Sequence, residues 1–376
     1  MNGIAIEDDY AGGNIRVIGQ ASGVVALEQQ LRDTSGWWFY WSFAATAAEA
    51  RAVAFEFANG EVIGPWGPAY SRDGIEWTWL GADASGSSRA SFAYAFEAGE
   101  KAYFSYCIPY QQHHFETFYA RISPHPLVRR KVLAVSERLR ALPLLVAGDA
   151  SAERHILITC RHHACESVSG YVMEGFLEHC LQPPYSLFLT QCKLHYVPFV
   201  DLDGAERGDQ GKGRAPHDHN RDYTDRPLYR STAALTAYAS ALPLEVGIDF
   251  HSPYLWGGRN DRPFIVKRRS PMKEEIERFG ALLMRATSRS EAAANELRYD
   301  GAHDIEAGED WNQPNDRTCS SFFERRGARL AFSFELPYFG VEGGVVTPDS
   351  CRRFGADFAA ALEAYMLEGG RHDEDR

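Results

Sequence analysis

Short apolar runs separated by turn residues fill the first third of the chain. The densest run, 37–43, reads Trp-Trp-Phe-Tyr-Trp-Ser-Phe, and aromatic residues favour strands. Asn59-Gly60 stands between two such runs and predicts a hairpin, because both residues tolerate a positive φ. Further strands are expected at 76–80, 91–96 and 102–108. This regular spacing predicts an all-β sandwich domain over residues 1–122.

From residue 123 onward, apolar runs typical of strands alternate with apolar positions at helical spacing. Residues 127–142 have the helical spacing and predict a helix, whereas 155–160 reads as a strand buried on both faces. Further strands are predicted at 187–189, 194–200, 244–250 and 330–336, and further helices at 168–180, 232–241, 272–287 and 351–368. The alternation predicts an α/β domain over 123–370, with a mainly parallel mixed sheet flanked by helices, and a charged, disordered tail over 371–376.

The composition is that of a globular protein without a membrane span. The 376 residues are 45% hydrophobic and 24% charged, and no apolar run reaches about 18 residues. The formal net charge of −12 argues against nucleic acid and membrane as partners, because nucleic acids and anionic membranes are bound through excess Lys and Arg. The first residues lack the pattern of a secretory signal, and the seven cysteines include no C-x-x-C. We therefore expect free thiols and a cytoplasmic location.

Two histidines and a glutamate stand where strands are predicted to end. His163 and Glu166 form a His-x-x-Glu pair just after the run 155–160, and His251 follows another strand-like run. The carboxyl ends of such strands face the crevice where open α/β sheets bind substrates. Two imidazoles and one carboxylate are the ligands of a hydrolytic zinc site with an open position. The alternatives are an exposed helix, a satisfied core histidine, or a thiolate ligand from Cys165.

Polar residues suited to peptide chemistry occur in two later segments. Glu335 stands in an apolar strand, where burial of a carboxylate is costly unless it is paired or near a metal, and where it suits a general base. Asn220 and Arg221 form a pair able to bind a carboxylate through parallel hydrogen bonds. The ordinary alternatives are exposure at a strand edge for Glu335, and a loop salt bridge to Asp218 or a neighbouring aspartate for Arg221.

Taken in order, these motifs resemble the zinc carboxypeptidase family and, within it, the cytosolic carboxypeptidase branch. Segments similar to that branch's motifs are 161–167 (zinc signature), 200–204 (V-N-P-D-G), 218–223 (D-x-N-R-x-[WY]), 249–252 (third ligand) and 333–336 (S-x-T-F-E-L). The resemblance covers about residues 125–370, and the branch also has a β-sandwich before its catalytic domain. Ala164 and Cys165 replace Pro and Gly of the zinc signature, which puts the pocket's shape in doubt but not the ligands.

The resemblance implies one zinc ion per chain, bound by His163, Glu166 and His251. It implies that Glu335 acts as general base toward the attacking water and then as general acid toward the leaving amine. The implied reaction is hydrolysis of the C-terminal residue of a peptide or protein.

The resemblance also implies residues that bind the substrate and stabilise the oxyanion. Asn220 and Arg221 would bind the terminal carboxylate. For the arginine that stabilises the oxyanion, our choice is Arg214, in a segment similar to the branch's G-N-Y-R, and Arg207 is the competitor.

The segment 311–326 lies where the family sets its side-chain preference. It contains Arg317, Arg325 and Arg326, so an acidic C-terminal residue is a plausible substrate.

One rival function is a zinc-dependent deacylase of N-acyl amino acids, a reaction that related folds perform with the same ligands. The other is a non-catalytic binding protein in which the sandwich recognises a partner; the presence of Glu335 argues against it.

Overall fold

The N-terminal strands form two sheets that pack through aromatic side chains. The computed structural model describes residues 3–85, 89–183, 187–288 and 296–373. One sheet has the order β1-β4-β9-β6-β7 and the other β2-β3-β5-β8. The strands are β1 (Ile4–Glu7), β2 (Arg16–Ala21), β3 (Val24–Glu28), β4 (Ser42–Ala47), β5 (Arg51–Phe57), β6 (Ala69–Ser71), β7 (Thr78–Trp79), β8 (Ser91–Phe96) and β9 (Lys101–Ser105). Phe92 of one sheet lies 5.0 Å from Phe104 of the other, measured between ring centroids, so aromatic rings join the two layers.

The hairpin predicted at Asn59-Gly60 is wrong. β5 instead pairs with β3 in parallel and with β8 in antiparallel, and residues 61–63 belong to no strand. The amides of Val62 and Ile63 bond the carbonyl of Arg89, and both side chains are buried. The backbone amides of this stretch are therefore paired with a residue distant in sequence. The local turn signal had predicted that residues 61–63 would instead pair with the preceding strand.

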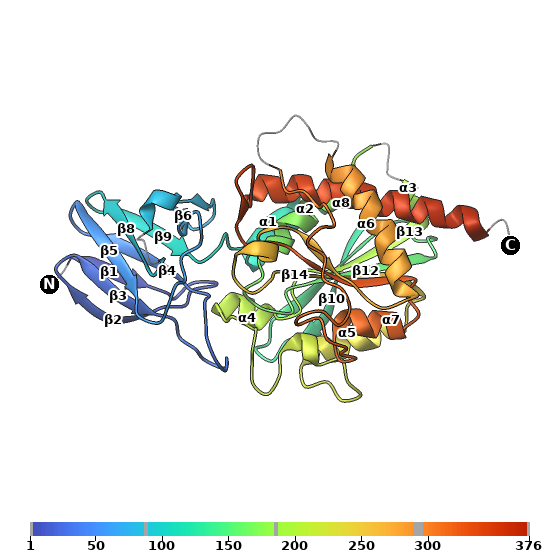
Figure 1. The fold of residues 1–376 in the computed structure, drawn as a ribbon, viewed down its shortest axis with the longest axis horizontal. Helices are drawn as coiled ribbons and strands as arrows, with labels where there is room; N and C mark the ends of the chain where they lie inside the picture. Colours follow the sequence, from blue (N-terminus) through green and yellow to red (C-terminus); the bar gives the residue numbers. More distant parts are fainter. Residues whose placement is uncertain (1–2, 86–88, 184–186, 289–295, 374–376) are drawn as a thin grey trace.

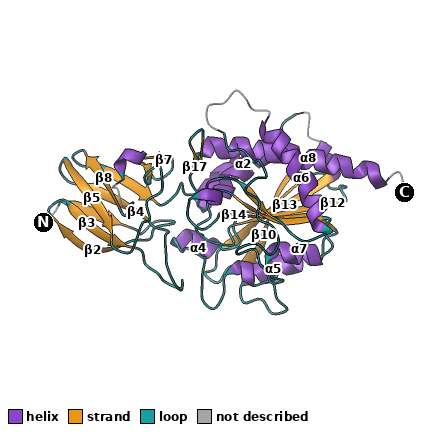
Figure 2. Ribbon diagram, viewed as in Figure 1, coloured by secondary structure: helices purple, strands orange, loops and turns teal. Residues whose placement is uncertain are grey.

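A seven-stranded mixed sheet with helices on both sides forms the rest of the molecule (Figures 1 and 2), as predicted. Its order is β10-β11-β13-β12-β14-β16-β15. The four central strands, β13, β12, β14 and β16, run parallel to one another. At the edges, β10, β11 and β15 pair in antiparallel. The strands are β10 (Val128–Val135), β11 (Ala141–Ala147), β12 (Arg154–Cys160), β13 (Cys192–Val197), β14 (Leu244–His251), β15 (Phe264–Val266) and β16 (Leu330–Glu335). A small hairpin, β17 (Gly340–Val341) and β18 (Gly344–Val345), follows β16.

The helices lie in two layers. In Figure 1, α2, α6 and α8 lie on one side of the large sheet, and α5 and α7 lie on the other. The helices are α1 (Gln112–Ile122), α2 (Val168–Leu181), α3 (Leu187–Gln191), α4 (Leu202–Arg207), α5 (Arg230–Ser240), α6 (Met272–Ser288), α7 (Cys319–Arg325) and α8 (Pro348–Asp373), with short 3-10 turns η1 (Ala82–Ala84), η2 (His219–Arg221) and η3 (Gly258–Asp261). Among the described residues, no helix has the length and apolar character needed to cross a membrane.

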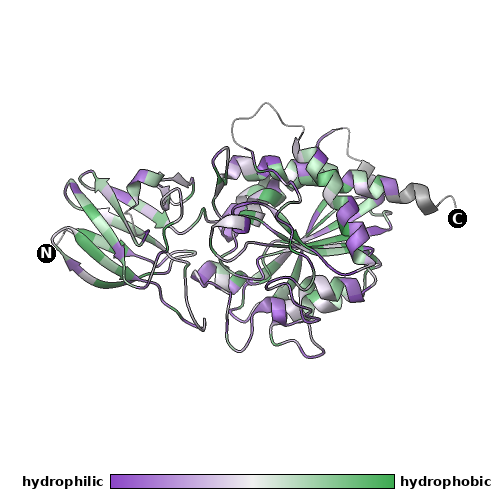
Figure 3. Cartoon of the chain, viewed as in Figure 1, coloured by the Kyte–Doolittle hydropathy of each residue, from purple (hydrophilic) through white to green (hydrophobic). Residues whose placement is uncertain are grey.

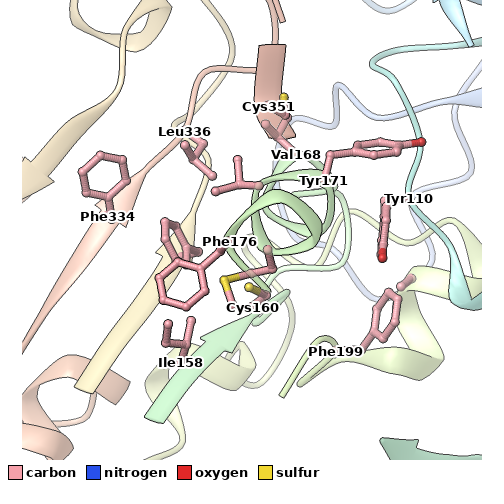
Figure 4. Packing of buried hydrophobic residues seen from close by; sticks show 14 of the residues in the cluster. Tyr110, Ile158, Cys160, Val168, Tyr171, Phe176, Phe199, Phe334, Leu336 and Cys351 are labelled. Atoms are coloured by element: carbon pink, nitrogen blue, oxygen red, sulfur yellow. The ribbon is translucent and has the colours of Figure 1, made fainter. Parts of the chain in front are cut away.

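Apolar residues are concentrated in the strands of the large sheet, and polar residues in the outer helices and loops (Figure 3). Phe176 of α2 lies near Ile158 and Phe334, which come from two strands of that sheet (Figure 4). Helices α2 and α8 cross very closely, because a Cβ at Gly175 would lie 1.9 Å from the carbonyl oxygen of Arg352. This packing anchors α2, whose first residues follow the His-x-x-Glu motif.

All seven cysteines are buried free thiols, in agreement with the prediction. Burial raises the pKa of each thiol, to about 11 for Cys192 and to about 12 for Cys107, Cys165 and Cys351.

Several further stretches differ from the sequence prediction, among them residues 37–41 of the densest aromatic run, which lie in no strand. Residues 127–142 form β10 and the start of β11 instead of a helix, because β11 pairs with β13 and draws the whole segment into the sheet. Residues 187–189, predicted as a strand, begin α3, and 112–122, placed in the all-β region, form α1. The predicted disordered tail is helical up to Asp373, and 374–376 lie outside the described residues.

Candidate active site

Parallel strands bring the predicted metal ligands to one end of the large sheet. β12 ends three residues before His163, and β14 ends at His251. In the pairing of β14 with β16, His251 stands opposite Glu335. His163, Glu166 and His251 each offer a ligand atom, and these atoms lie within 4.8 Å of one another. The three side chains proposed as ligands therefore meet at one point, with Glu335 on the neighbouring strand.

Both imidazoles present the same ring nitrogen to Glu166. His163 Nδ1 lies 2.8 Å from Glu166 Oε1, and His251 Nδ1 lies 2.9 Å from Oε2. The opposite nitrogens face other carboxylates, with His251 Nε2 2.6 Å from Asp249 Oδ2 and His163 Nε2 3.5 Å from Asp218 Oδ1. A carboxylate behind an imidazole fixes its tautomer and orientation, as is usual for metal-binding histidines. This donor set fits a divalent ion of the zinc type.

Ionised groups within this cluster stabilise one another. Burial alone would raise the pKa of Glu166, but His163, Lys212 and His251 hold it well below its usual range. Burial alone would lower the pKa of His251, but Asp249 and Glu166 raise it well above its usual range. A divalent ion binding here would replace the imidazole protons, so its affinity would increase with pH.

A second group of possible ligands lies directly behind the first. His162, Asp249 and Cys319 are buried and also lie within 4.8 Å of one another. His162 Nδ1 is 2.8 Å from Asp249 Oδ1, and its Nε2 is 2.6 Å from the hydroxyl of Tyr223. Because Asp249 also bonds His251, this group supports the first site by orienting one of its ligands.

Glu335 is a buried carboxylate next to the cluster. Its side chain is 7% exposed, and Oε2 has no hydrogen-bond partner among the described residues. Burial raises its pKa; His251 and Lys212 act in the opposite direction without cancelling the rise. An unpartnered buried oxygen beside a metal-type donor set is suited to accepting a proton.

The cluster opens into a cavity of about 410 Å³, a volume typical of small-molecule and peptide-end sites. Its walls include ionic, amide, hydroxyl and aromatic side chains. Among the lining residues are His163, Lys212, Asn220, Arg221, His251, Tyr254, Arg268, Trp311, Asn315, Thr318, Ser320, Ser333 and Glu335.

Asn220 and Arg221 both line this cavity. Asn220 Nδ2 lies 3.1 Å from His251 Nε2, and Asn220 Oδ1 accepts a hydrogen bond from the amide of Cys319. The Arg221 guanidinium bonds the carbonyl of Asn220 at 3.2 Å. Among the described residues, Arg221 forms no ion pair at close range, although its charge is one of those that lower the pKa of Asp218; it lines the cavity and can meet an anion there.

The structure does not bring Arg214 to the cavity, which corrects the expectation that it stabilises the oxyanion. Its guanidinium lies 2.7 Å from Asp33, 2.8 Å from Asp201 and 3.1 Å from Asp209. The competitor, Arg207, is also absent from the lining and faces Asp209 at 3.5 Å. Three carboxylates occupy the donors of Arg214, one of them from the N-terminal domain.

Sequence reasoning missed two cations that do line the cavity, Lys212 and Arg268. Lys212 belongs to the segment Gly211–Arg214 that resembles the branch's G-N-Y-R, in which the resemblance implied a role for the arginine. Arg268 follows β15, and no motif distinguished it. The arginines expected to set specificity lie elsewhere: Arg325 and Arg326 bond backbone carbonyls, and neither they nor Arg317 line the cavity.

Comparison with known proteins shows the class of fold. No family model matches the chain. A metallo-carboxypeptidase from Pseudomonas aeruginosa, solved in complex with (2-guanidinoethylmercapto)succinic acid, superposes with a TM-score of 0.82 at 18% identity, over 97% of this chain and 99% of that one. The match includes the N-terminal sheets as well as the large sheet. The chain therefore has the metallo-carboxypeptidase fold.

Curated relatives place the resemblance more narrowly. Cytosolic carboxypeptidase 6 of Caenorhabditis elegans is 27% identical over 165 residues, which are 39% of this chain and 36% of the relative. An uncharacterized protein of Zymomonas mobilis is 26% identical over 242 residues, 62% of each chain. The chain thus spans less than two thirds of either relative's length. The resemblance to the zinc carboxypeptidases, on the cytosolic carboxypeptidase side, is confirmed.

Proposed function

We propose that this protein is a zinc-dependent metallocarboxypeptidase that hydrolyses the last peptide bond of a peptide or protein. The observation that supports this most strongly is the meeting of His163, Glu166 and His251 beside the unpartnered carboxylate of Glu335, in a cavity that also holds the unpaired Arg221. A structural metal site would need neither a free base nor an open cavity.

Each of these residues has a task in the proposed reaction. Arg221 binds the C-terminal carboxylate of the substrate, which places the scissile bond next to the ligand cluster. Glu335 takes a proton from the attacking water and passes it to the leaving amine. Zinc, when bound by His163, Glu166 and His251, supplies Lewis acidity that polarises the scissile carbonyl and activates water. Asp249 holds the His251 imidazole in its ligand tautomer.

An acidic C-terminal residue is the substrate that the cavity favours. Arg268 lines it, and its guanidinium Nε lies 3.0 Å from Glu324 Oε2. A substrate carboxylate would share this guanidinium with Glu324. Arg268→Gln is expected to lower kcat/KM for peptides ending in Glu about tenfold and to leave those ending in Ala unchanged. Arg325→Gln is the matched control, because Arg325 does not line this cavity but lines two other pockets. Equal effects of the two variants would contradict the role given to Arg268.

The experiment that tests the function combines metal analysis with mass spectrometry of a peptide library. Each peptide is supplied with a free and with an amidated C-terminus, to the zinc-loaded and the chelator-treated protein. We expect removal of one residue from free ends only, and only with metal. Equal trimming of amidated ends would contradict the role of Arg221, and hydrolysis confined to N-acyl amino acids would favour a deacylase.

The free, buried thiols and the names of the curated relatives support a cytoplasmic location for this activity.

A further inference from the structure

Lys212 is the cation that lies against the ligand cluster. Its Nζ is 2.5 Å from Glu166 Oε1 and donates to the carbonyl oxygen of Ser252 at 2.5 Å. The side chain is 17% exposed and lines the cavity. An ammonium group held at this depth, with part of its surface toward the cavity, is placed to interact with a substrate atom next to the cluster.

The other two cations of the cavity are engaged differently. The Arg221 guanidinium donates a hydrogen bond to the carbonyl oxygen of Asn220, and Arg268 is paired with Glu324. Arg214 is bound by three aspartates outside the cavity. Among the described lysines and arginines that line the cavity, Lys212 is thus the one within bonding distance of a proposed metal ligand.

We propose that Lys212 is a catalytic residue that stabilises the oxyanion, in place of the arginine expected there; this rests on the proposed peptidase function. As water adds to the carbonyl carbon, a C–O bond forms, the water proton passes to Glu335, and the carbonyl π electrons move to the oxygen. The Lys212 ammonium compensates this negative charge. When the C–N bond breaks, the electrons return to re-form the carbonyl and Glu335 gives its proton to the amine nitrogen. A preformed charge in a largely desolvated site is effective because it needs little reorganisation.

The loop that carries Lys212 is fixed from two sides. On the side of the metal motif, the carbonyl of Gln210 accepts a hydrogen bond from the amide of Cys165 at 3.1 Å. On the other side, the N-terminal domain holds the loop, since Ser35 N donates to Gly213 O at 2.9 Å and Phe39 N donates to Gln210 Oε1 at 2.8 Å. The sandwich domain therefore contributes to placing a cation in the active site.

A pair of substitutions tests the assignment in the zinc-loaded, full-length protein. Lys212→Met keeps the side-chain length and removes the charge, whereas Lys212→Arg restores a cation. We expect Lys212→Met to lower kcat about 10²–10³-fold, the usual effect of removing one oxyanion donor, with KM within about threefold and zinc content unchanged. Lys212→Arg should recover at least tenfold of the loss. Lys131→Met, at an exposed position of β10, is the matched control and should behave as wild type.

The possible outcomes separate this inference from the function it rests on. A zinc-loaded Lys212→Met variant with kcat within threefold of wild type overturns the role of Lys212 and leaves the peptidase proposal intact. Equal loss of zinc and of activity in Lys212→Met overturns it as well, because Lys212 would then be part of the metal site's structure. No turnover by zinc-loaded wild type on free-ended peptides overturns both proposals.

Discussion

Replacing Gly211 with alanine should damage the metal centre more than the fold. The backbone φ at Gly211 is +80°, and an added Cβ would lie 2.4 Å from the amide nitrogen of Ala164 and 3.0 Å from the Cα of His163. Ordinary van der Waals contact for a Cβ begins at 3.4 Å, so the loop and the zinc motif would have to separate by about 1 Å, a misplacement that can cost about 10² in rate. The motif includes a proposed ligand, so the separation would displace it.

Two free-energy costs add in this variant. A left-handed backbone costs about 1–2 kcal/mol for a residue with a Cβ, and overpacking against rigid backbone costs about 1–3 kcal/mol. The total loss in the free energy of unfolding is therefore about 2–5 kcal/mol. We expect kcat/KM to fall about 10²-fold and zinc affinity to fall about tenfold or more.

Gly99→Ala separates the two costs. Its φ is +79°, and nothing lies within 4 Å of an added Cβ, so it imposes the backbone cost alone. The assays are zinc competition with a chelator, steady-state kinetics and thermal unfolding, on both variants and wild type. Gly211→Ala with wild-type zinc affinity and kcat/KM, or an equal effect of the two variants on both, would refute the reasoning.

Three further predictions concern the base, the substrate carboxylate and pH. Glu335→Gln should lower kcat about 10²–10⁴-fold with zinc content unchanged; loss of zinc, measured by metal analysis, would show that Glu335 serves as a ligand. Arg221→Met should lower kcat/KM about 10²-fold for free-ended peptides with zinc content unchanged; a kcat/KM close to that of wild type would remove its role. Burial and Glu296 raise the pKa of Asp357 to about 6, so its favourable, protonated state is lost as pH rises through that value. Asp357→Asn should therefore raise Tm by about 2 °C at pH 8, for about 1 kcal/mol after solvent screening, and leave Tm unchanged at pH 4; the same shift at both pH values would contradict this account.

The position of the candidate site's residues at strand ends could be predicted because their signal is local. His251 and Glu335 each close an apolar run, and parallel pairing puts the ends of such runs at one edge of the sheet. The alternation of strands and helices indicated the mixed sheet, and the runs at 91–96 and 102–108 indicated strands of the N-terminal sheets, whereas most of the densest aromatic run, residues 37–41, lies in no strand. In these regions, each residue's burial depends chiefly on its own segment.

Loop paths and edge strands were not predictable, because distant segments decide them. Arg214 was chosen by its place in a motif, but Asp33, far away in the chain, binds it outside the cavity. The apolar positions of 127–142 also fit a helix, and pairing with residues 192–197 through β11 decides for strands. Lys212 enters the cavity because Gly211 lets the backbone touch the zinc motif, a relation that spacing along the chain cannot show.

Alkylation of the seven buried thiols can be used to measure how often the folded chain opens. Since none is exposed and each is held in its protonated form at neutral pH, an alkylating reagent meets no reactive sulfur while the chain is folded. The rate of carbamidomethylation would then count excursions from the native state, and the order in which cysteines react would map which layers separate first.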